Sequence, residues 1–199
     1  MQKENISLNL THKQLAMASY NYNEPLIVEH LKNPDTCRKA FEEVIAHYTE
    51  PLYWHIRKLV ISHDDANDIL QNTFLKAWSN IEYFRGDAKL STWLFKIATN
   101  ESLTFLAKER VRANVDIEDD SYLIENIQAD EWFDSDELQA NLQKAISKLP
   151  EKQRLIFNMR YFDEMKYEDI SDILGTTVGA LKASYHHAVK KIESFFESL

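Results

Sequence analysis

The sequence predicts an all-α protein built from two small helical domains. The chain of 199 residues contains only three Gly and four Pro, too few turn residues for an architecture of many short strands. Apolar residues instead recur at three- and four-residue steps, the spacing of one buried helical face. The length is sufficient for two small domains with hydrophobic cores.

The first domain is expected over residues 25–112, after a flexible N-terminal extension of residues 1–24. Apolar side chains at helical spacing from residue 36 to residue 60 predict one helix. Because proline removes a helical hydrogen bond, we expect a break or bend near Pro51.

Two further helices follow in this domain. The first is predicted to begin at Asp64 or Asp65, since either carboxylate can cap a helix. Gly86 then interrupts the helical pattern. The next helix is predicted to be capped by Ser91 or Thr92.

The charge is distributed unevenly along the chain, whose net charge is −9. Residues 1–112 carry 14 basic and 14 acidic side chains, and residues 138–199 carry nine and eight. Residues 113–137 carry ten acidic side chains and no basic one, which predicts an extended acidic linker. DNA affinity depends on local basic surface, so the net charge does not exclude a DNA-binding protein. A chain of this charge is expected to bind DNA poorly without a partner.

The second domain, residues 138–199, ends in a helix-turn-helix pattern. Glu168–Leu174 predicts a short helix, and Gly175 supplies a left-handed turn residue. Thr176 or Thr177 is expected to cap the last helix. This order of elements is typical of DNA-binding helix pairs, although a simple helical hairpin with a solvated basic face gives the same spacing.

The exposed face of the last helix is suited to a major groove. No acidic residue lies between Asp172 and Glu193. We expect lysines to contact phosphates and short polar groups to contact base edges. The candidate DNA-binding residues here are Thr177, Lys182, Ser184, His186, His187, Lys190 and Lys191.

The first domain offers a polar helix flank opposite its buried stripe. Asp68, Gln71 and Asn72 share this flank with Leu75, which provides an apolar contact. Taken alone, these residues are typical of an ordinary solvated helix face, and a protein-binding surface is the alternative.

Residues 76–112 hold seven basic and four acidic side chains, interleaved with aromatic ones. Aromatic rings beside cations suit single-stranded DNA, in which bases stack and phosphates pair with cations. The candidates are Phe84, Arg85, Lys89 and Lys96, and the alternative for Phe84 and Trp93 is a place in the core.

One pattern imitates an enzyme. His47, His55 and His63-Asp64, followed by Asp68, imitate the ligands of HD-type metal phosphohydrolases. Asp64 is better explained as a helix cap, and no distant aspartate completes the set. We therefore expect no metal, no cofactor and no catalytic residue.

Two stretches in this order resemble a bacterial sigma factor of the extracytoplasmic-function (ECF) type. The resemblance covers residues 37–112 and 138–199. The residues that carry it are Ile69–Trp78, Phe84–Asp87 and Thr92–Asn100 in the first domain, and Tyr167–Gly175 and Val178–Lys182 in the second.

The resemblance implies sigma region 2 over residues 25–112 and sigma region 4 over residues 138–199. Asp68, Gln71, Asn72 and Leu75 would then bind the clamp helices of core RNA polymerase. The loop Phe84–Ser91 and the helix after it would open the minus-ten element and hold it as single strands, with Asn100 as a polar contact. The last helix would bind the duplex minus-thirty-five element. Ser184 and His187 stand where such proteins often place arginines, which weakens bidentate guanine recognition.

The resemblance also implies partners: core RNA polymerase, promoter DNA and an anti-sigma factor, which such proteins often have. A helix-turn-helix transcription regulator with a helical sensor domain remains the alternative. The single Cys37 excludes an internal disulfide and suits a reducing compartment. No stretch approaches the ~20 apolar residues of a membrane span, and no signal pattern begins the chain, so we expect a cytoplasmic protein without membrane insertion.

Overall fold

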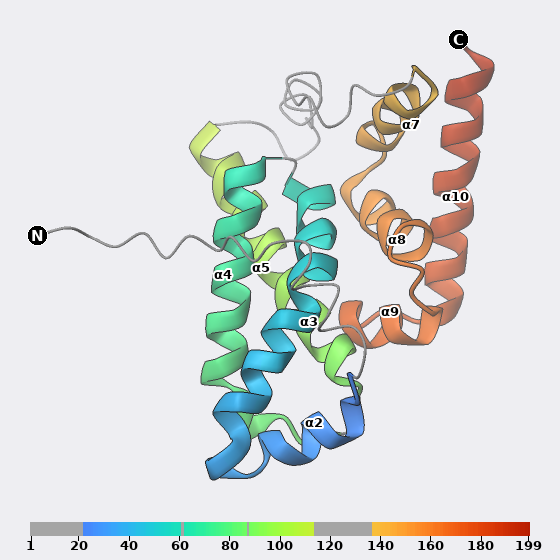
Figure 1. Cartoon of the computed structure of the whole chain (residues 1–199). Helices are drawn as coiled ribbons and strands as arrows, with labels where there is room; N and C mark the ends of the chain where they lie inside the picture. Colours follow the sequence, from blue (N-terminus) through green and yellow to red (C-terminus); the bar gives the residue numbers. More distant parts are fainter. Residues whose placement is uncertain (1–21, 61, 87, 114–136) are drawn as a thin grey trace, which may run out of the picture.

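The computed structural model describes residues 22–60, 62–86, 88–113 and 137–199, and each regular element within these ranges is a helix (Figure 1). The all-α prediction is therefore confirmed for the described part of the chain. Most of the predicted extension, residues 1–21, and nearly all of the predicted linker, residues 114–136, lie outside the described residues.

Residues 22–113 form an N-terminal helical group. A continuous buried cluster of aliphatic and aromatic side chains joins its helices, and Val44, Leu52, Ile56 and Leu94 are fully buried in it. Each such side chain contributes about 1.5–3 kcal/mol to folding. The elements are α2 (Glu24–Leu31), α3 (Pro34–Val60), α4 (His63–Ser79), the 3₁₀ turn η1 (Ile81–Tyr83) and α5 (Leu90–Ala113).

Helix α2 was not predicted, and it begins within the predicted N-terminal extension. The Asn23 side chain caps it by accepting a hydrogen bond of 3.3 Å from the Leu26 N–H. Tyr22 stacks on His47 of α3 with ring centroids 3.7 Å apart. Residues 22–24 therefore belong to the packed helical group and not to the predicted extension.

Helix α3 is continuous through Pro51, so the predicted break does not occur. Proline costs the helix a backbone hydrogen bond. Directly after Pro51, the side chains of Leu52, His55 and Ile56 are buried, and their packing keeps the backbone helical.

Helix α4 is capped by Ser62, rather than by either predicted aspartate. The Ser62 hydroxyl accepts a hydrogen bond of 3.3 Å from the Asp65 N–H. Asp64 and Asp65 lie in the first turn, where the positive end of the helix dipole favours carboxylates.

The start of α5 is held by a residue that is distant in sequence. Its first residue, Leu90, donates its N–H to a carboxylate oxygen of Glu24 in α2 at 3.0 Å. Tyr48 donates to the other oxygen of Glu24, also at 3.0 Å. The predicted caps Ser91 and Thr92 lie inside the helix instead.

Residues 137–199 form a C-terminal helical group. Gly175 has a φ of 62°, the left-handed conformation that favours glycine, and the Thr177 hydroxyl accepts from the Ala180 N–H at 3.4 Å. The predicted helix-turn-helix is thus present, with Thr177 as the cap. The elements are α7 (Glu137–Ser147), α8 (Glu151–Tyr161), α9 (Tyr167–Leu174) and α10 (Val178–Glu197).

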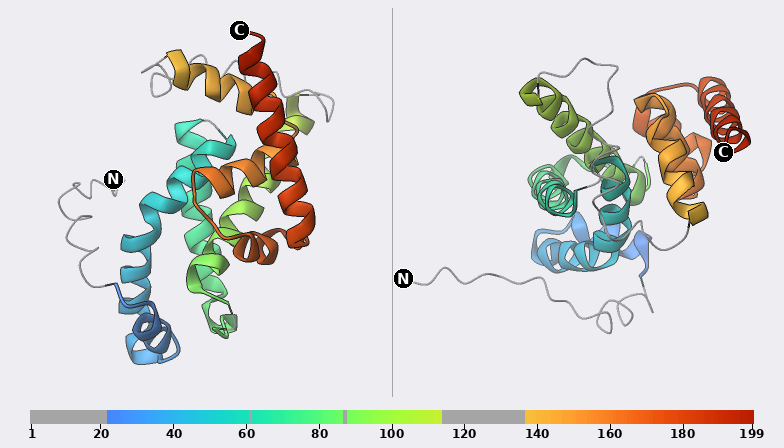
Figure 2. Two further views of the ribbon diagram at one scale, coloured as in Figure 1. Left: turned by 90° about the vertical axis from the view of Figure 1, so that its right-hand side faces the viewer. Right: turned by 90° about the horizontal axis from the view of Figure 1, so that it is seen from above.

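The two groups are in direct contact. α9 lies against α5, and α8 lies against α3 (Figures 1 and 2). Ile156, Ile170 and Leu181 belong to the same buried cluster as the core of the N-terminal group. A second cluster, which includes Leu149, Phe157 and Ala188, joins α7, α8 and α10.

Candidate functional site

An apolar groove runs between α3 and α4 and has a volume of about 720 Å³. Leu75 is 63 % exposed and Trp78 42 % exposed at this groove. The floor is aromatic, since Trp78 packs on Phe41 with ring centroids 5.0 Å apart. Its lining residues are Arg38, Phe41, Glu42, Ile45, Gln71, Phe74, Leu75 and Trp78.

The predicted polar flank of α4 borders this groove. Asp68, Gln71 and Asn72 are all exposed, while Ile69 and Thr73 on the opposite side are buried. The helical pattern of α4 predicts its buried and exposed faces correctly, except that Trp78, which the pattern assigns to the buried face, is exposed. The groove beside Leu75 is a feature that the sequence did not predict. Exposed apolar patches with polar rims are typical of protein-interaction sites.

The cations at the start of α5 are exposed but engaged with α9. Nζ of Lys89 lies 3.2 Å from both carboxylate oxygens of Asp169. The Thr92 hydroxyl lies 3.4 Å from one of the same oxygens. Nζ of Lys96 donates to the backbone carbonyl of Asp172 at 3.1 Å.

Phe84 does not lie in the predicted DNA-binding surface. Its side chain is 7 % exposed and packs on Trp93 with ring centroids 5.1 Å apart. The ring fills the core beneath the loop, and hydrophobic burial holds it there. The neighbouring Tyr83 is 76 % exposed and Arg85 is also exposed, so Tyr83 is the aromatic side chain that this loop presents to solvent.

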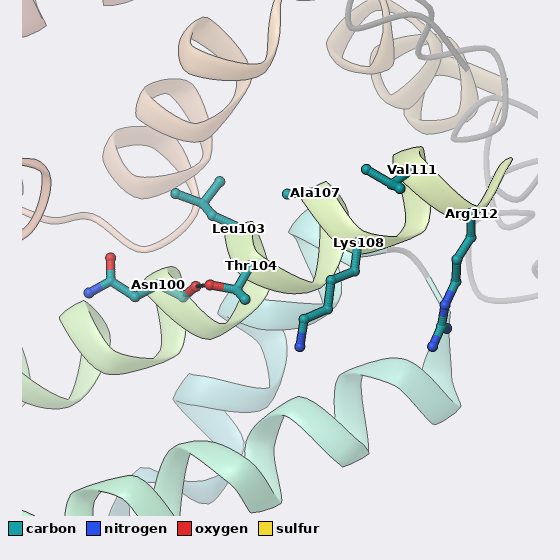
Figure 3. A pocket seen from close by; sticks show the side chains of 7 residues that line it. All are labelled: Asn100, Leu103, Thr104, Ala107, Lys108, Val111 and Arg112. Carbon is teal, nitrogen blue, oxygen red and sulfur yellow. Dashed lines mark hydrogen bonds between the residues drawn. The ribbon is translucent and has the colours of Figure 1, made fainter. Parts of the chain in front are cut away.

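The second half of α5 presents a further surface with a cavity of about 830 Å³ (Figure 3). Lys108 and Arg112 extend from the same side of the helix, and exposed Asn100 lies at the other end of the cavity. Sequence reasoning did not single out Lys108 and Arg112, although both belong to the basic excess of residues 76–112. The lining residues are Asn100, Leu103, Thr104, Ala107, Lys108, Val111 and Arg112.

Helix α10 places most of its predicted DNA-binding side chains in solvent. Leu181, Ala188 and Ile192 are buried on the face that packs against the rest of the group. Nζ of Lys182 lies 5.7 Å from the centre of the Tyr167 ring. Lys182, His186, His187, Lys190 and Lys191 are exposed, and Ser184 is half-buried.

Each of the three histidines that imitate a metal site contacts a different partner. His47 stacks on Tyr22. Nδ1 of His63 lies 2.7 Å from the Tyr53 hydroxyl. His55 is buried and hydrogen-bonded to Asp163. Among the described residues, no group of three or more His, Cys, Asp and Glu side chains could hold a metal ion.

None of the described helices is both long enough and apolar enough to cross a lipid bilayer.

Comparison with known families gives the class of the protein. Residues 44–112 match the family model "Sigma-70 region 2", and residues 139–192 match "Sigma-70, region 4". These matches cover α4, α5 and most of α3 in the N-terminal group, and nearly all of the C-terminal group. The chain therefore combines two helical regions of a sigma-70-type transcription initiation factor, with region 2 before region 4.

The similar curated proteins narrow this class. The chain is 31 % identical over 156 residues to the ECF RNA polymerase sigma factor SigW of Bacillus subtilis, covering 74 % of this chain and 83 % of that protein. It is 28 % identical over 190 residues to the ECF RNA polymerase sigma-E factor of Escherichia coli, covering 91 % and 98 %. The chain belongs to the ECF RNA polymerase sigma factors, and it directs transcription initiation.

Two solved structures share its fold. One is CnrH in complex with the cytosolic domain of CnrY, with a TM-score of 0.64 and 19 % identity over 88 % of this chain and 97 % of that one. The other is the sigma factor RpoE in complex with the anti-sigma factor NepR from Bartonella quintana, with a TM-score of 0.62 and 23 % identity over 80 % and 98 %.

Proposed function

We propose that three surfaces of this sigma factor each have a separate role in transcription initiation. The groove between α3 and α4 binds core RNA polymerase, the loop before α5 and the start of α5 handle the minus-ten element, and α10 binds the minus-thirty-five element. The observation that carries this assignment is α10 itself. It follows a left-handed Gly175 turn, and its solvent face bears lysines and histidines with no acidic side chain before Glu193.

The polymerase contact is expected to be part apolar and part polar. Exposed Leu75 and Trp78 supply apolar area that a partner helix can cover. Asp68, Gln71 and Asn72 supply hydrogen-bonding groups along the rim. A helix laid in an apolar groove is a common mode of protein recognition, and the clamp helices of the polymerase are the partner proposed here.

The minus-ten contact is expected to combine charge with stacking. Arg85, Lys89 and Lys96 supply cations for phosphates, and Asn100 supplies an amide for a base edge. Exposed Tyr83, instead of buried Phe84, is the ring on which a base can stack.

The minus-thirty-five contact is expected to depend strongly on phosphates. Exposed Lys182, Lys190 and Lys191 are proposed to contact phosphates, and Ser184, His186 and His187 are proposed to contact base edges. The Thr177 hydroxyl already caps α10, so Thr177 contributes through the helix N-terminus. The absence of arginine from this face of the helix predicts weaker guanine recognition.

The chain is proposed to act in the cytoplasm as a binding protein, with catalysis supplied by the polymerase. An anti-sigma factor is a proposed partner. The two structural neighbours described above are complexes, one with the cytosolic domain of CnrY and one with the anti-sigma factor NepR. A regulator that covered the groove at Leu75 and Trp78 would compete directly with polymerase.

The test is reconstitution with core RNA polymerase, followed by sequencing of the DNA that the holoenzyme binds. We expect one recurrent pair of elements and transcripts that begin at a fixed distance downstream. The alternative, a helix-turn-helix regulator, predicts that the chain selects DNA equally well alone and does not co-purify with polymerase.

A further inference from the structure

Helix α2 contacts both the loop that precedes α5 and the start of α5. Its residue Glu24 accepts a hydrogen bond of 3.0 Å from the N–H of Leu90, the first residue of α5. Towards the other end of α2, a Cβ on Gly86 of the loop would lie 3.7 Å from Cγ1 of Val28 and 3.6 Å from Nζ of Lys32. One short helix therefore supports the whole segment that is proposed to handle the minus-ten element.

Both carboxylate oxygens of Glu24 are engaged. One accepts from the Leu90 N–H, and the other accepts from the Tyr48 hydroxyl at 3.0 Å. Tyr48 is buried in the core of the N-terminal group, so the carboxylate is fixed relative to α3. The first N–H groups of a helix have no acceptor within the helix, and a carboxylate there also complements the positive end of the helix dipole. Glu24 is thus a cap for α5 that a different helix supplies.

The capped residue is next to the cations of the minus-ten surface. Exposed Lys89 immediately precedes Leu90, whose side chain is fully buried. The backbone that carries Lys89 is therefore held by Glu24 through the Leu90 N–H and by the core through the Leu90 side chain. Groups that are ordered before a ligand arrives do not have to be ordered on binding, so a strand that separates during opening meets cations already in place.

We propose that Glu24 is a positioning residue for promoter opening, which caps α5 from α2 and thereby sets Lys89 and the loop before it for the separated strand. The inference rests on the proposed role of the start of α5 in minus-ten binding. Glu24 and the rest of α2 lie outside residues 44–112, which match Sigma-70 region 2, so this role does not follow from that match.

The test uses the full-length protein assembled with core polymerase and measures two steps separately. Promoter opening is the rate at which minus-ten thymines become reactive to permanganate, at a holoenzyme concentration that saturates the promoter. Binding to a duplex that carries only the minus-thirty-five element is measured by fluorescence anisotropy. Glu24→Ala removes both hydrogen bonds. Glu24→Gln can keep both, because its amide oxygen can accept from the Leu90 N–H and its amide nitrogen can donate to the Tyr48 hydroxyl.

We expect Glu24→Ala to slow opening about five- to tenfold, the size expected from losing one hydrogen bond to a charged group. Its affinities for core polymerase and for the minus-thirty-five duplex should be unchanged, and Glu24→Gln should retain most of the parental opening rate. Glu29→Ala removes an exposed carboxylate from the same helix and is the matched control, which should open like the parent. Parental opening by Glu24→Ala, an equal loss of opening and polymerase binding, or opening by Glu24→Gln as slow as by Glu24→Ala would overturn the positioning role.

Tyr48→Phe is a second variant, for the case in which circular dichroism shows that Glu24→Ala does not fold. It keeps the buried ring and removes only the hydroxyl that fixes the Glu24 carboxylate. Opening should slow about two- to threefold, because the Leu90 bond remains and loses one of its supports. Where Glu24→Ala is unfolded, parental opening by Tyr48→Phe would overturn the proposal.

A further holoenzyme separates this outcome from failure of the proposed function. It carries Lys89→Ala with Lys96→Ala and is measured in the same opening assay. Parental opening would remove the minus-ten assignment itself, and the positioning role with it. Slow opening by this double mutant, together with parental opening by Glu24→Ala, would overturn only the positioning role.

Discussion

Asp163 accepts a hydrogen bond of 2.6 Å from Nδ1 of His55, and this bond joins the C-terminal helical group to α3 of the N-terminal group. The other oxygen of Asp163 accepts from the ammonium group of Lys58. Nε2 of His55 lies 3.0 Å from the Thr99 hydroxyl, which itself donates to the Phe95 carbonyl at 2.7 Å. Both ring nitrogens of His55 are therefore engaged, and Asp163 pairs with Lys58 where the two groups meet.

The Asp163 cluster should stabilise the contact between the two helical groups at neutral pH and lose that effect in acid. Burial alone would raise the pKa of the Asp163 carboxyl, but His55 and Lys58 outweigh burial and lower it. A lowered pKa stabilises the packing above the ordinary carboxyl value of about 3.9, and the effect is lost as the pH falls through the lowered pKa. We expect Asp163→Asn to reduce the free energy of unfolding by about 3 kcal/mol at neutral pH, since it breaks a buried ion pair.

Urea unfolding at several pH values checks this prediction. The gap between the parent and Asp163→Asn should be constant from neutral pH down to mildly acidic pH and should narrow below the ordinary carboxyl range. Exposed Asp172→Asn is the control and should stay within about 0.5 kcal/mol of the parent. A gap that does not change with pH would show that Asp163 acts through packing instead of charge.

The sequence was sufficient to predict the helices, but not the contacts between helices that are far apart along the chain. Gly175 and Thr177 are local signals, and both were identified correctly. Leu90, by contrast, donates to a carboxylate that lies 66 residues earlier in the chain, which no local capping rule can detect. The start of α5 and the interface of the two groups depend on such long-range partners.

The candidate functional site also combines features that the local sequence predicts with contacts that it does not predict. The periodicity of α4 places Gln71 and Leu75 on one exposed flank, as the structure has them. Phe84 is an aromatic residue beside cations in a loop, the pattern of a DNA-binding loop, yet it is buried against Trp93. A ring beside a turn can face either the solvent or the core, and the local sequence does not distinguish the two. The pairing of Lys89 with Asp169 joins residues 80 positions apart and leaves no trace in the local sequence.

The polar flank of α4 can be changed without disturbing the fold. Asp68 and Gln71 are exposed and take part in no described core contact, so Asp68→Ala with Gln71→Ala should lower core polymerase binding while the melting temperature moves little. Competition binding to polymerase and thermal denaturation measure the two effects. Glu50→Ala, an exposed carboxylate of α3 outside the groove, is the control. A double mutant that competes as well as the parent would remove the polymerase-binding assignment.

The lysines of α10 should act through phosphates. Lys182→Ala, Lys190→Ala and Lys191→Ala should each reduce the salt slope of promoter binding by the holoenzyme by about one unit, across promoter sequences. Ser184 and His186 substitutions should change which minus-thirty-five sequence is preferred. Lys148→Ala removes an exposed cation of the same group outside α10 and should leave the slope unchanged. Unaltered slopes in all three α10 variants would place this helix outside the groove.

The thiol of Cys37 should be slow to react. Burial raises its pKa, and the nearby carboxylate of Glu82 raises it further. Less thiolate is therefore present at neutral pH, and the thiolate is the nucleophile. We expect iodoacetamide to label the folded protein more slowly than the urea-unfolded chain at the same pH. Equal or faster labelling of the folded protein would indicate an activated thiol and would reopen a role in redox sensing.

Of the ten acidic residues from 116 to 137, all but Glu137 at the start of α7 lie outside the described residues, and their effect on DNA binding is testable by charge removal. Replacing every Asp and Glu there with Asn and Gln deletes the ten carboxylates that account for the negative charge of the chain. We expect the free variant to bind DNA more tightly at about 0.1 M salt and equally at about 1 M salt, because salt screens the field of the linker. Holoenzyme assembly should be unchanged.

Weaker assembly, or altered early transcription without a gain in free DNA binding, would instead indicate that the linker threads a positively charged channel of the polymerase.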